Sequence, residues 1–202
     1  MWCYFNTGRI EQLKNEFDIL ITWRAYPLRP ELPEDGVRLE DLFSKKSIDI
    51  DAMRRKLHKT AAELGLPLGK MAYMFDSRTA QELRYWAEAN GAGDAFAKAV
   101  YKAYFAHDRN IARTEVLADI SESVGLCPEI AVKVLESETY ASTVDADWSK
   151  AKEEEIVIAP TLAHGEWRLA GFHPYEKMAD FVKKQGAPSA DQETPENARA
   201  HR

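Results

Sequence analysis

Residues 1–10 read Met1-Trp2-Cys3-Tyr4-Phe5-Asn6-Thr7-Gly8-Arg9-Ile10, and they place a cysteine directly before a helical pattern. Cys3 precedes a helical pattern over residues 4–16, in which Ile10, Leu13 and Phe17 continue one apolar stripe. A helix N-terminus offers unpaired N–H groups and the positive end of the helix dipole, and both stabilise a thiolate. We therefore expect Cys3 to be an acidic thiol suited to sulfur chemistry. The competing interpretation is that a lone cysteine beside aromatic residues is buried packing.

Size and composition indicate a soluble globular protein. The chain has 202 residues, of which 45% are hydrophobic, which suits one compact domain or one domain with a large insertion. The net charge of -6 argues against nucleic-acid binding, which needs a basic face. We expect no membrane span, because no apolar run is long enough, and the first residues show no signal peptide.

Cysteine usage bears on the compartment. The two cysteines, Cys3 and Cys127, do not make a disulfide scaffold, which favours a reducing compartment and hence the cytoplasm. A targeting segment upstream of Met1 would change that assignment. The five histidines show no metal-ligand spacing with acids or cysteines, so no metal site is expected.

The predicted elements follow the order helix, strand, helical block, strand, hairpin, helix. Residues 18–26 alternate as a strand does, whereas the block up to about residue 153 is helical. Its first stripe is closed by Gly65 and comprises Ile50, Met53, Leu57, Ala61 and Leu64. Residues 156–158 predict a short strand, and residues 161–170 predict a hairpin with a glycine turn. If the two ends share a sheet, the block is an insertion in one α/β domain.

A resemblance to a known family rests on several stretches in the same order. They are Trp2-Cys3-Tyr4, Trp23-Arg24-Ala25-Tyr26-Pro27-Leu28, Ala103-Tyr104-Phe105, Asn110-Ile111, Glu115-Val116-Leu117, Val124-Gly125-Leu126 and Val157-Ile158-Ala159-Pro160-Thr161. From Trp2 to about Lys184 the chain resembles the DsbA-like branch of thioredoxin-fold proteins, and within it the FrnE-type oxidoreductases. The resemblance implies an α/β thioredoxin-like fold with a large all-helical insertion. The thioredoxin-like domain would comprise residues 1–37 and 151–186, the insertion residues 38–150, and residues 187–202 a disordered tail.

The family implies thiol–disulfide exchange with thiols or disulfides of proteins or small molecules. Its first motif cysteine attacks a disulfide sulfur and its second resolves the mixed disulfide, and the second position falls on Cys3. Pro160 falls on the family's cis-proline, which lies against the cysteines and frees the backbone of Ala159 for strand addition by an extended substrate. The substrate-binding residues implied are Trp2, Ala159, Thr161 and His173.

The chain departs from the family at its start. Met1 and Trp2 occupy the middle of Cys-x-x-Cys, so the nucleophile's position falls immediately before Met1. The strand that precedes the motif in the family is missing too, which leaves the strand at 19–25 with an unpaired edge. We hypothesise a truncation within the motif, and expect a partner chain, as in a homodimer, or a rearranged strand to fill the vacant place. The chain as given is expected to be inactive in redox cycling.

Two other functions stay open. The 2-hydroxychromene-2-carboxylate isomerases and kappa-class glutathione transferases are similar in architecture and bind glutathione, with a serine at the nucleophile position. Glutathione is therefore a candidate small partner, although no built-in cofactor is expected. The Trp2-Cys3-Tyr4 stretch favours the redox branch, because those enzymes do not need the second cysteine. The third interpretation is a non-catalytic thioredoxin-fold binding module in which only the cis-proline segment works.

Overall fold

A computed structural model describes residues 1–45 and 48–190. Helices dominate this part of the chain, and the strands are short and pair in twos. The helices are α1 Trp2–Phe5, α2 Thr7–Glu16, α3 Leu39–Leu42, α4 Ile50–Glu63, α5 Arg78–Ala89, α6 Gly93–Tyr101, the π-helix η1 Lys102–Ala106, α7 Thr114–Ser123, α8 Pro128–Glu136, α9 Ala141–Glu153 and α10 Tyr175–Lys184. The strands are β1 Val37–Arg38, β2 Tyr73–Met74, β3 Thr161–His164 and β4 Trp167–Ala170.

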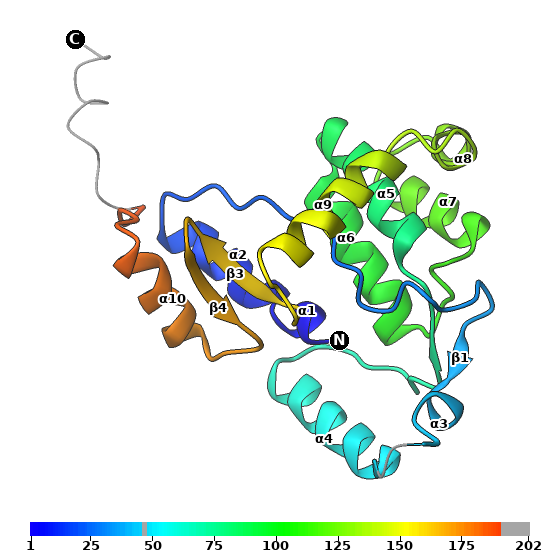
Figure 1. The fold of residues 1–202 in the computed structure, drawn as a ribbon, viewed down its shortest axis with the longest axis horizontal. Helices are drawn as coiled ribbons and strands as arrows, with labels where there is room; N and C mark the ends of the chain where they lie inside the picture. The colour runs from blue at the N-terminus through cyan, green and yellow to red at the C-terminus, as the bar shows by residue number, and fades with distance from the viewer. Residues whose placement is uncertain (46–47, 191–202) are drawn as a thin grey trace.

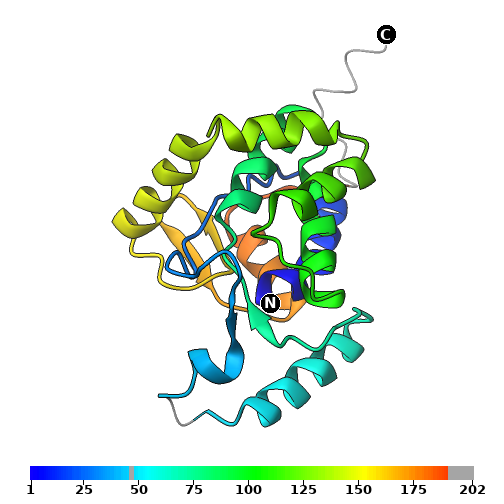
Figure 2. The same ribbon diagram turned by 90° about the vertical axis from the view of Figure 1, so that its right-hand side faces the viewer.

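The elements separate into two main groups with α1 between them. Figure 1 shows the hairpin β3–β4 beside α2 and α10 on one side, and α5 to α9 packed together on the other. Figure 2 shows α4 below the N-terminal residues, and its Leu57 and Ala61 belong to one buried cluster with Tyr4 and Phe5 of α1. The fold is thus the expected α/β arrangement with a helical insertion. Of the described residues, none belongs to a helix long and apolar enough to cross a membrane.

The predicted hairpin is confirmed. Thr161 pairs with Ala170 and His164 with Trp167, and Gly165 adopts a positive φ of 53° in the turn, a conformation that glycine tolerates best. The hairpin packs on α2 and α10 through an apolar cluster. That cluster includes Ile10, Leu13, Phe17, Leu162, Leu169, Met178 and Ala179.

Residues 18–26 are extended but form no ladder with any described strand, so the prediction of a strand over these residues is wrong. The alternation itself is confirmed: Ile19, Ile21 and Trp23 pack on the cluster with α2 and α10, whereas Leu20 is 94% exposed. Side chains alternate between buried and exposed whenever one face of an extended segment is covered. A ladder also needs a neighbouring strand about 4.8 Å away. We predicted that a partner chain, as in a homodimer, or a rearranged strand fills the vacant position beside this segment. This stays a prediction.

Two further predictions need correction. Residues 187–190 are not a disordered tail, because Ser189 forms a bridge with Phe17 and the Ala190 N–H donates to the Glu16 carbonyl over 2.9 Å. The rest of the predicted tail, 191–202, lies outside the described residues.

The insertion is not wholly helical either: β1 and β2 pair antiparallel over two residues, Val37 with Met74 and Arg38 with Tyr73.

Residues 18–26 have no strand ladder to hold them. Side chains of the helical insertion bind their backbone instead. Asp147 of α9 accepts hydrogen bonds from the Ala25 N–H over 2.7 Å, from Arg24 over 3.2 Å and from the Tyr85 hydroxyl. Burial, followed by that contact, raises the pKa of Tyr85 to about 12. The Gln81 amide pairs with both backbone groups of Tyr26, over 3.1 and 3.2 Å. It thereby imitates the peptide of an adjacent strand.

Asp147→Ala tests this attachment. The substitution leaves the Ala25 N–H and the Tyr85 hydroxyl without their acceptor in a site where Asp147 is only 5% exposed. We expect the free energy of unfolding, measured by urea titration, to fall by about 2–3 kcal/mol. Asp145→Ala on the same helix is the matched control. It removes a partly exposed ion pair with Arg78 and should cost less than about 1 kcal/mol. Equal losses in the two variants would contradict the attachment.

Candidate active site

Cys3 lies inside α1, a four-residue helix that its neighbours hold firmly. Tyr4 and Phe5 are buried, and the Tyr4 ring stacks on Phe105 with centroids 5.5 Å apart. The Tyr4 hydroxyl donates to the Pro67 carbonyl over 2.9 Å. These contacts anchor α1 to the helical insertion and fix the backbone that carries Cys3.

Phe172 joins α1 to the proline segment from the other end of the chain. Its ring lies 5.1 Å from that of Trp2 and 6.2 Å from that of Phe5, between centroids. The adjacent Gly171 N–H donates to the Pro160 carbonyl over 2.7 Å. The Ala159–Pro160 peptide bond is cis, the isomer that the resemblance implies. Two stretches more than 150 residues apart therefore meet at one place.

The turn around Pro160 is closed on one side and open on the other. The Thr161 hydroxyl donates to the Ile158 carbonyl over 2.7 Å, so it supports the turn and is not free for a substrate. Among the described residues, the backbone N–H and C=O of Ala159 have no hydrogen-bond partner. An extended polypeptide can pair with such groups by strand addition.

His173 is tied into its own loop. Its ring Nε2 lies 2.8 Å from the Ala170 carbonyl, and its own carbonyl accepts from Arg9 over 2.8 Å. The Arg9 guanidinium also lies 4.2 Å from the centroid of the Phe172 ring, an attractive cation–π geometry. Arg9 and Phe172 are thus site residues that the sequence did not reveal, because their roles depend on contacts between distant segments.

The expectation of an acidic Cys3 thiol is wrong. Cys3 keeps part of its surface exposed and forms no disulfide, but its thiol lies among close neighbours. Burial raises the pKa of this thiol above its ordinary value; the Met1 amino group, the Cys3 backbone and the Tyr101 hydroxyl oppose the rise without cancelling it. A four-residue helix has little dipole to offer, so the cost of burying a charge prevails.

Comparison with known proteins shows the family to which this chain belongs. The sequence pattern of the DSBA-like thioredoxin domain matches residues 1–183. The chain belongs to this family. A Bacillus subtilis protein, YwbO, is 25% identical over 189 residues, which cover 91% of this DsbA-like chain and 93% of YwbO.

Two solved structures show the same fold. A probable DsbA oxidoreductase from Streptomyces coelicolor is 22% identical, with a TM-score of 0.82 over 96% of this DsbA-like chain and 87% of its own. The cytosolic disulfide reductase DsbM from Pseudomonas aeruginosa, solved with GSH, is 17% identical, with a TM-score of 0.63 over 91% of this chain and 93% of its own.

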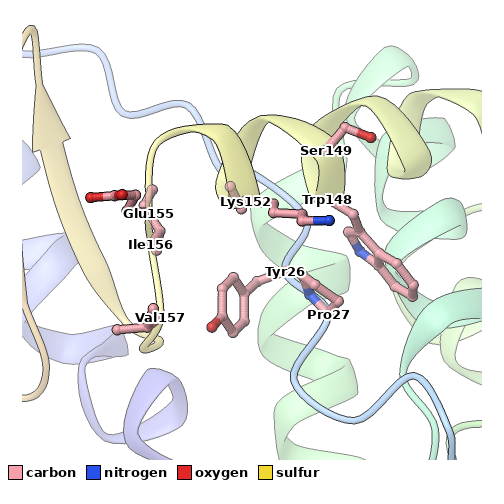
Figure 3. Close-up of a pocket in the computed structure, with 9 residues that line it drawn as sticks. Tyr26, Pro27, Trp148, Ser149, Lys152, Glu155, Ile156 and Val157 are labelled. Carbon is pink, nitrogen blue, oxygen red and sulfur yellow. The ribbon is translucent and has the colours of Figure 1, made fainter.

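An open cavity of about 960 Å³ lies between the extended segment and the chain that leaves α9. Figure 3 shows the Tyr26 ring standing between Val157 on one side and Pro27 and Trp148 on the other. The Trp148 indole donates to Gln81 over 3.0 Å, which fixes one wall. Cys3 does not line this cavity. No cluster of three or more His, Cys, Asp or Glu side chains suited to a metal occurs in the described part of this DsbA-like domain.

The buried Cys3 thiol should react slowly at neutral pH. The exposed Cys127 serves as an internal control. At pH 7.5 we expect iodoacetamide to label Cys3 several-fold more slowly than Cys127, because the raised pKa of Cys3 leaves little thiolate. The Cys3 rate should climb as the pH increases toward 10, followed by peptide mass spectrometry. If Cys3 is labelled as fast as Cys127 at pH 7.5, the Cys3 thiol is not buried and protonated as described.

Proposed function

We propose that this DsbA-like domain carries out thiol–disulfide exchange through Cys3. The observation that carries the proposal is a free cysteine on α1 that adjoins the cis-proline segment through the Trp2–Phe172 contact. Membership of the DSBA-like thioredoxin domain family supports it. Both thiols are free, so the proposal extends to a reducing compartment, the cytoplasm.

The chemistry needs one thiolate and one disulfide. The resemblance gives Cys3 the resolving role, in which its thiolate attacks a mixed disulfide. We propose that the same thiolate attacks a substrate disulfide: a new S–S bond forms to Cys3, and the other sulfur leaves as a thiolate. A second thiolate must then attack the mixed disulfide to regenerate Cys3. An external thiol such as glutathione can supply this second thiolate.

Substrate recognition would use the open side of the proline turn. The unpaired backbone of Ala159 suits an extended segment that carries the disulfide. Ile158 is 45% exposed beside it, and Trp2 also keeps part of its surface exposed. Such a surface favours apolar side chains next to the reacting sulfur. Thr161 and His173 would act indirectly, by supporting the turn and the following loop.

Glutathione is the small partner that fits the same groups. It offers peptide groups for Ala159 and a sulfur for Cys3, and it accompanies DsbM in the solved structure. A glutathione-dependent isomerase or transferase would bind the reduced tripeptide without forming a bond to Cys3. A non-catalytic binding module would hold extended peptides whether or not Cys3 is present. Covalent attachment to Cys3 therefore separates exchange from both alternatives.

A glutathione disulfide assay tests the proposal. We expect the Cys127→Ser variant to gain one glutathione adduct, at Cys3, when incubated with glutathione disulfide at pH 9. Added reduced glutathione should remove the adduct, as resolution by an external thiol requires. Intact-mass and peptide spectra measure both steps.

The control is Cys3→Ser in the same Cys127→Ser background, which should gain no adduct. Reduced glutathione that binds without an adduct at Cys3, seen by calorimetry, would contradict exchange and favour the isomerase alternative. Absence of any adduct at pH 9, where an alkylating reagent still labels Cys3, would also end the proposal.

A further inference from the structure

Helix α4, at the lower margin of the molecule in Figure 2, carries a cluster of positive charge on its outer surface. Arg55, Lys56 and Lys59 are exposed. Because Arg55 and Lys56 lie four and three residues before Lys59, their side chains neighbour that of Lys59 on the helix. These three residues are called the α4 basic face.

The α4 basic face contrasts with the charge of the whole protein. Four cations against two acids give α4 a net charge of +2. The full chain has a net charge of -6, so the residues outside α4 carry -8. A local positive surface on an acidic protein attracts negative groups to one place.

Acidic side chains neutralise little of this face. Arg55 and Lys56 form no ion pair with the residues that the structure describes, whereas Arg54 pairs with Glu40 over 2.8 Å. Lys59 lies 4.0 Å from a carboxylate oxygen of Glu63, and both side chains are more than half exposed, so the pair is weak. Like charges three or four residues apart destabilise a helix. An anionic partner would offset that cost.

The opposite face of α4 is attached beside Cys3. Leu57 and Ala61 are buried in one cluster with Tyr4 and Phe5, the two residues that follow Cys3. An α-helix with its side chains is about 10–12 Å across. The α4 basic face therefore lies about one helix diameter from the cluster that carries Cys3.

The segment after α4 is fixed as well. The Asp108 carboxylate accepts hydrogen bonds from the N–H groups of Lys70 and Met71, over 2.8 and 2.7 Å. The Gly69 N–H donates to the Phe105 carbonyl over 2.8 Å. These bonds join the end of the α4 segment to η1, so the basic face keeps a defined position relative to the site.

We propose that the α4 basic face docks an acidic segment of a protein whose disulfide or thiol reacts at Cys3. The inference rests on the proposed function and names the class of partner for it. Arg55 can bind a carboxylate through two parallel hydrogen bonds, and the two lysines act as point charges. Opposite charges speed encounter over a screening length of about 8 Å at physiological ionic strength. Docking would hold the partner's sulfur close to Cys3 before exchange.

The size of the basic face favours a short acidic segment over a long polyanion. The charge of -8 outside α4 would repel the rest of a nucleic acid or of an anionic membrane surface. A few carboxylates on a folded or extended protein need only the three cations of the α4 basic face. The partner is therefore a protein with local acidic groups.

Binding of an acidic peptide tests the docking step without any exchange. The probe is a fluorescein-labelled peptide with six glutamates separated by serines, and its counterpart has glutamine at those six positions. In 50 mM salt we expect fluorescence anisotropy to show binding of the glutamate peptide alone, weakened several-fold in 300 mM salt. The combined variant Arg55→Glu, Lys56→Glu and Lys59→Glu should lose this binding.

The matched control is the combined variant Lys102→Glu, Lys133→Glu and Lys184→Glu. These lysines are exposed on η1, α8 and α10, and their substitution changes the net charge by the same amount. The control should keep most of the binding, and circular dichroism checks that both variants stay folded. Equal loss in the two variants would mean that binding follows total charge, which would overturn the inference.

A second measurement connects docking to Cys3. Each peptide receives a terminal cysteine and a Gly-Ser spacer, and its sulfur is joined to 2-thiopyridine. In the Cys127→Ser background, the Cys3 thiolate attacks the peptide sulfur, an S–S bond forms to Cys3, and 2-thiopyridine leaves with the electron pair of the broken bond. We expect the glutamate peptide to react several-fold faster than the glutamine peptide. The ratio should fall to about one in the α4 variant.

Equal binding of the two peptides would overturn the inference. So would tighter binding of a short DNA duplex or of anionic phospholipid vesicles than of the glutamate peptide, or self-association of the protein that the α4 variant abolishes. The proposed function fails separately. Binding without release of 2-thiopyridine would contradict exchange at Cys3 alone, and release at the same rate from both peptides would contradict docking alone.

Discussion

The Phe172 ring contacts both the Trp2 ring, with centroids 5.1 Å apart, and the Arg9 guanidinium, which lies 4.2 Å from its centroid. The arrangement joins the first turn of the chain to the loop that follows the hairpin. The Phe5–Phe172 contact and the hydrogen bond from Arg9 to the His173 carbonyl lie at the same junction, and together these contacts set the position of α1 relative to the proline segment. Aromatic and cation–π contacts of this kind combine apolar burial with a preferred geometry.

The helical insertion is part of the site. Gln81 and Asp147 hold the extended segment 18–26 through hydrogen bonds to the backbone of Tyr26 and Ala25. The Tyr101 ring, from the same insertion, lies 6.4 Å between centroids from the ring of Tyr4, the neighbour of Cys3. Buried side chains that satisfy backbone groups offset the desolvation cost that those groups would otherwise carry. The insertion therefore supports the extended segment and the environment of the reactive sulfur together.

Features that depend only on neighbouring residues could be predicted from the sequence. The glycine turn of the hairpin at Gly165 and the α4 stripe are both present. The pairing of residues 18–26 could not be predicted, because alternation records a covered face and not a neighbouring strand. The raised pKa of Cys3 comes from burial in the folded chain, which no local pattern in the sequence records. Arg9 and Phe172 likewise carried no signal, since stacking between distant segments exists only in the folded chain.

The most direct test of this account is the distance between the two ends of the chain at the site. Nuclear Overhauser spectroscopy on a sample with selectively labelled Trp and Phe rings would measure it. The account predicts cross-peaks between the Trp2 indole and the Phe172 ring, whose centroids are 5.1 Å apart. Absence of those cross-peaks in the folded protein, with both spin systems assigned, would separate Cys3 from the proline segment and contradict the proposed site.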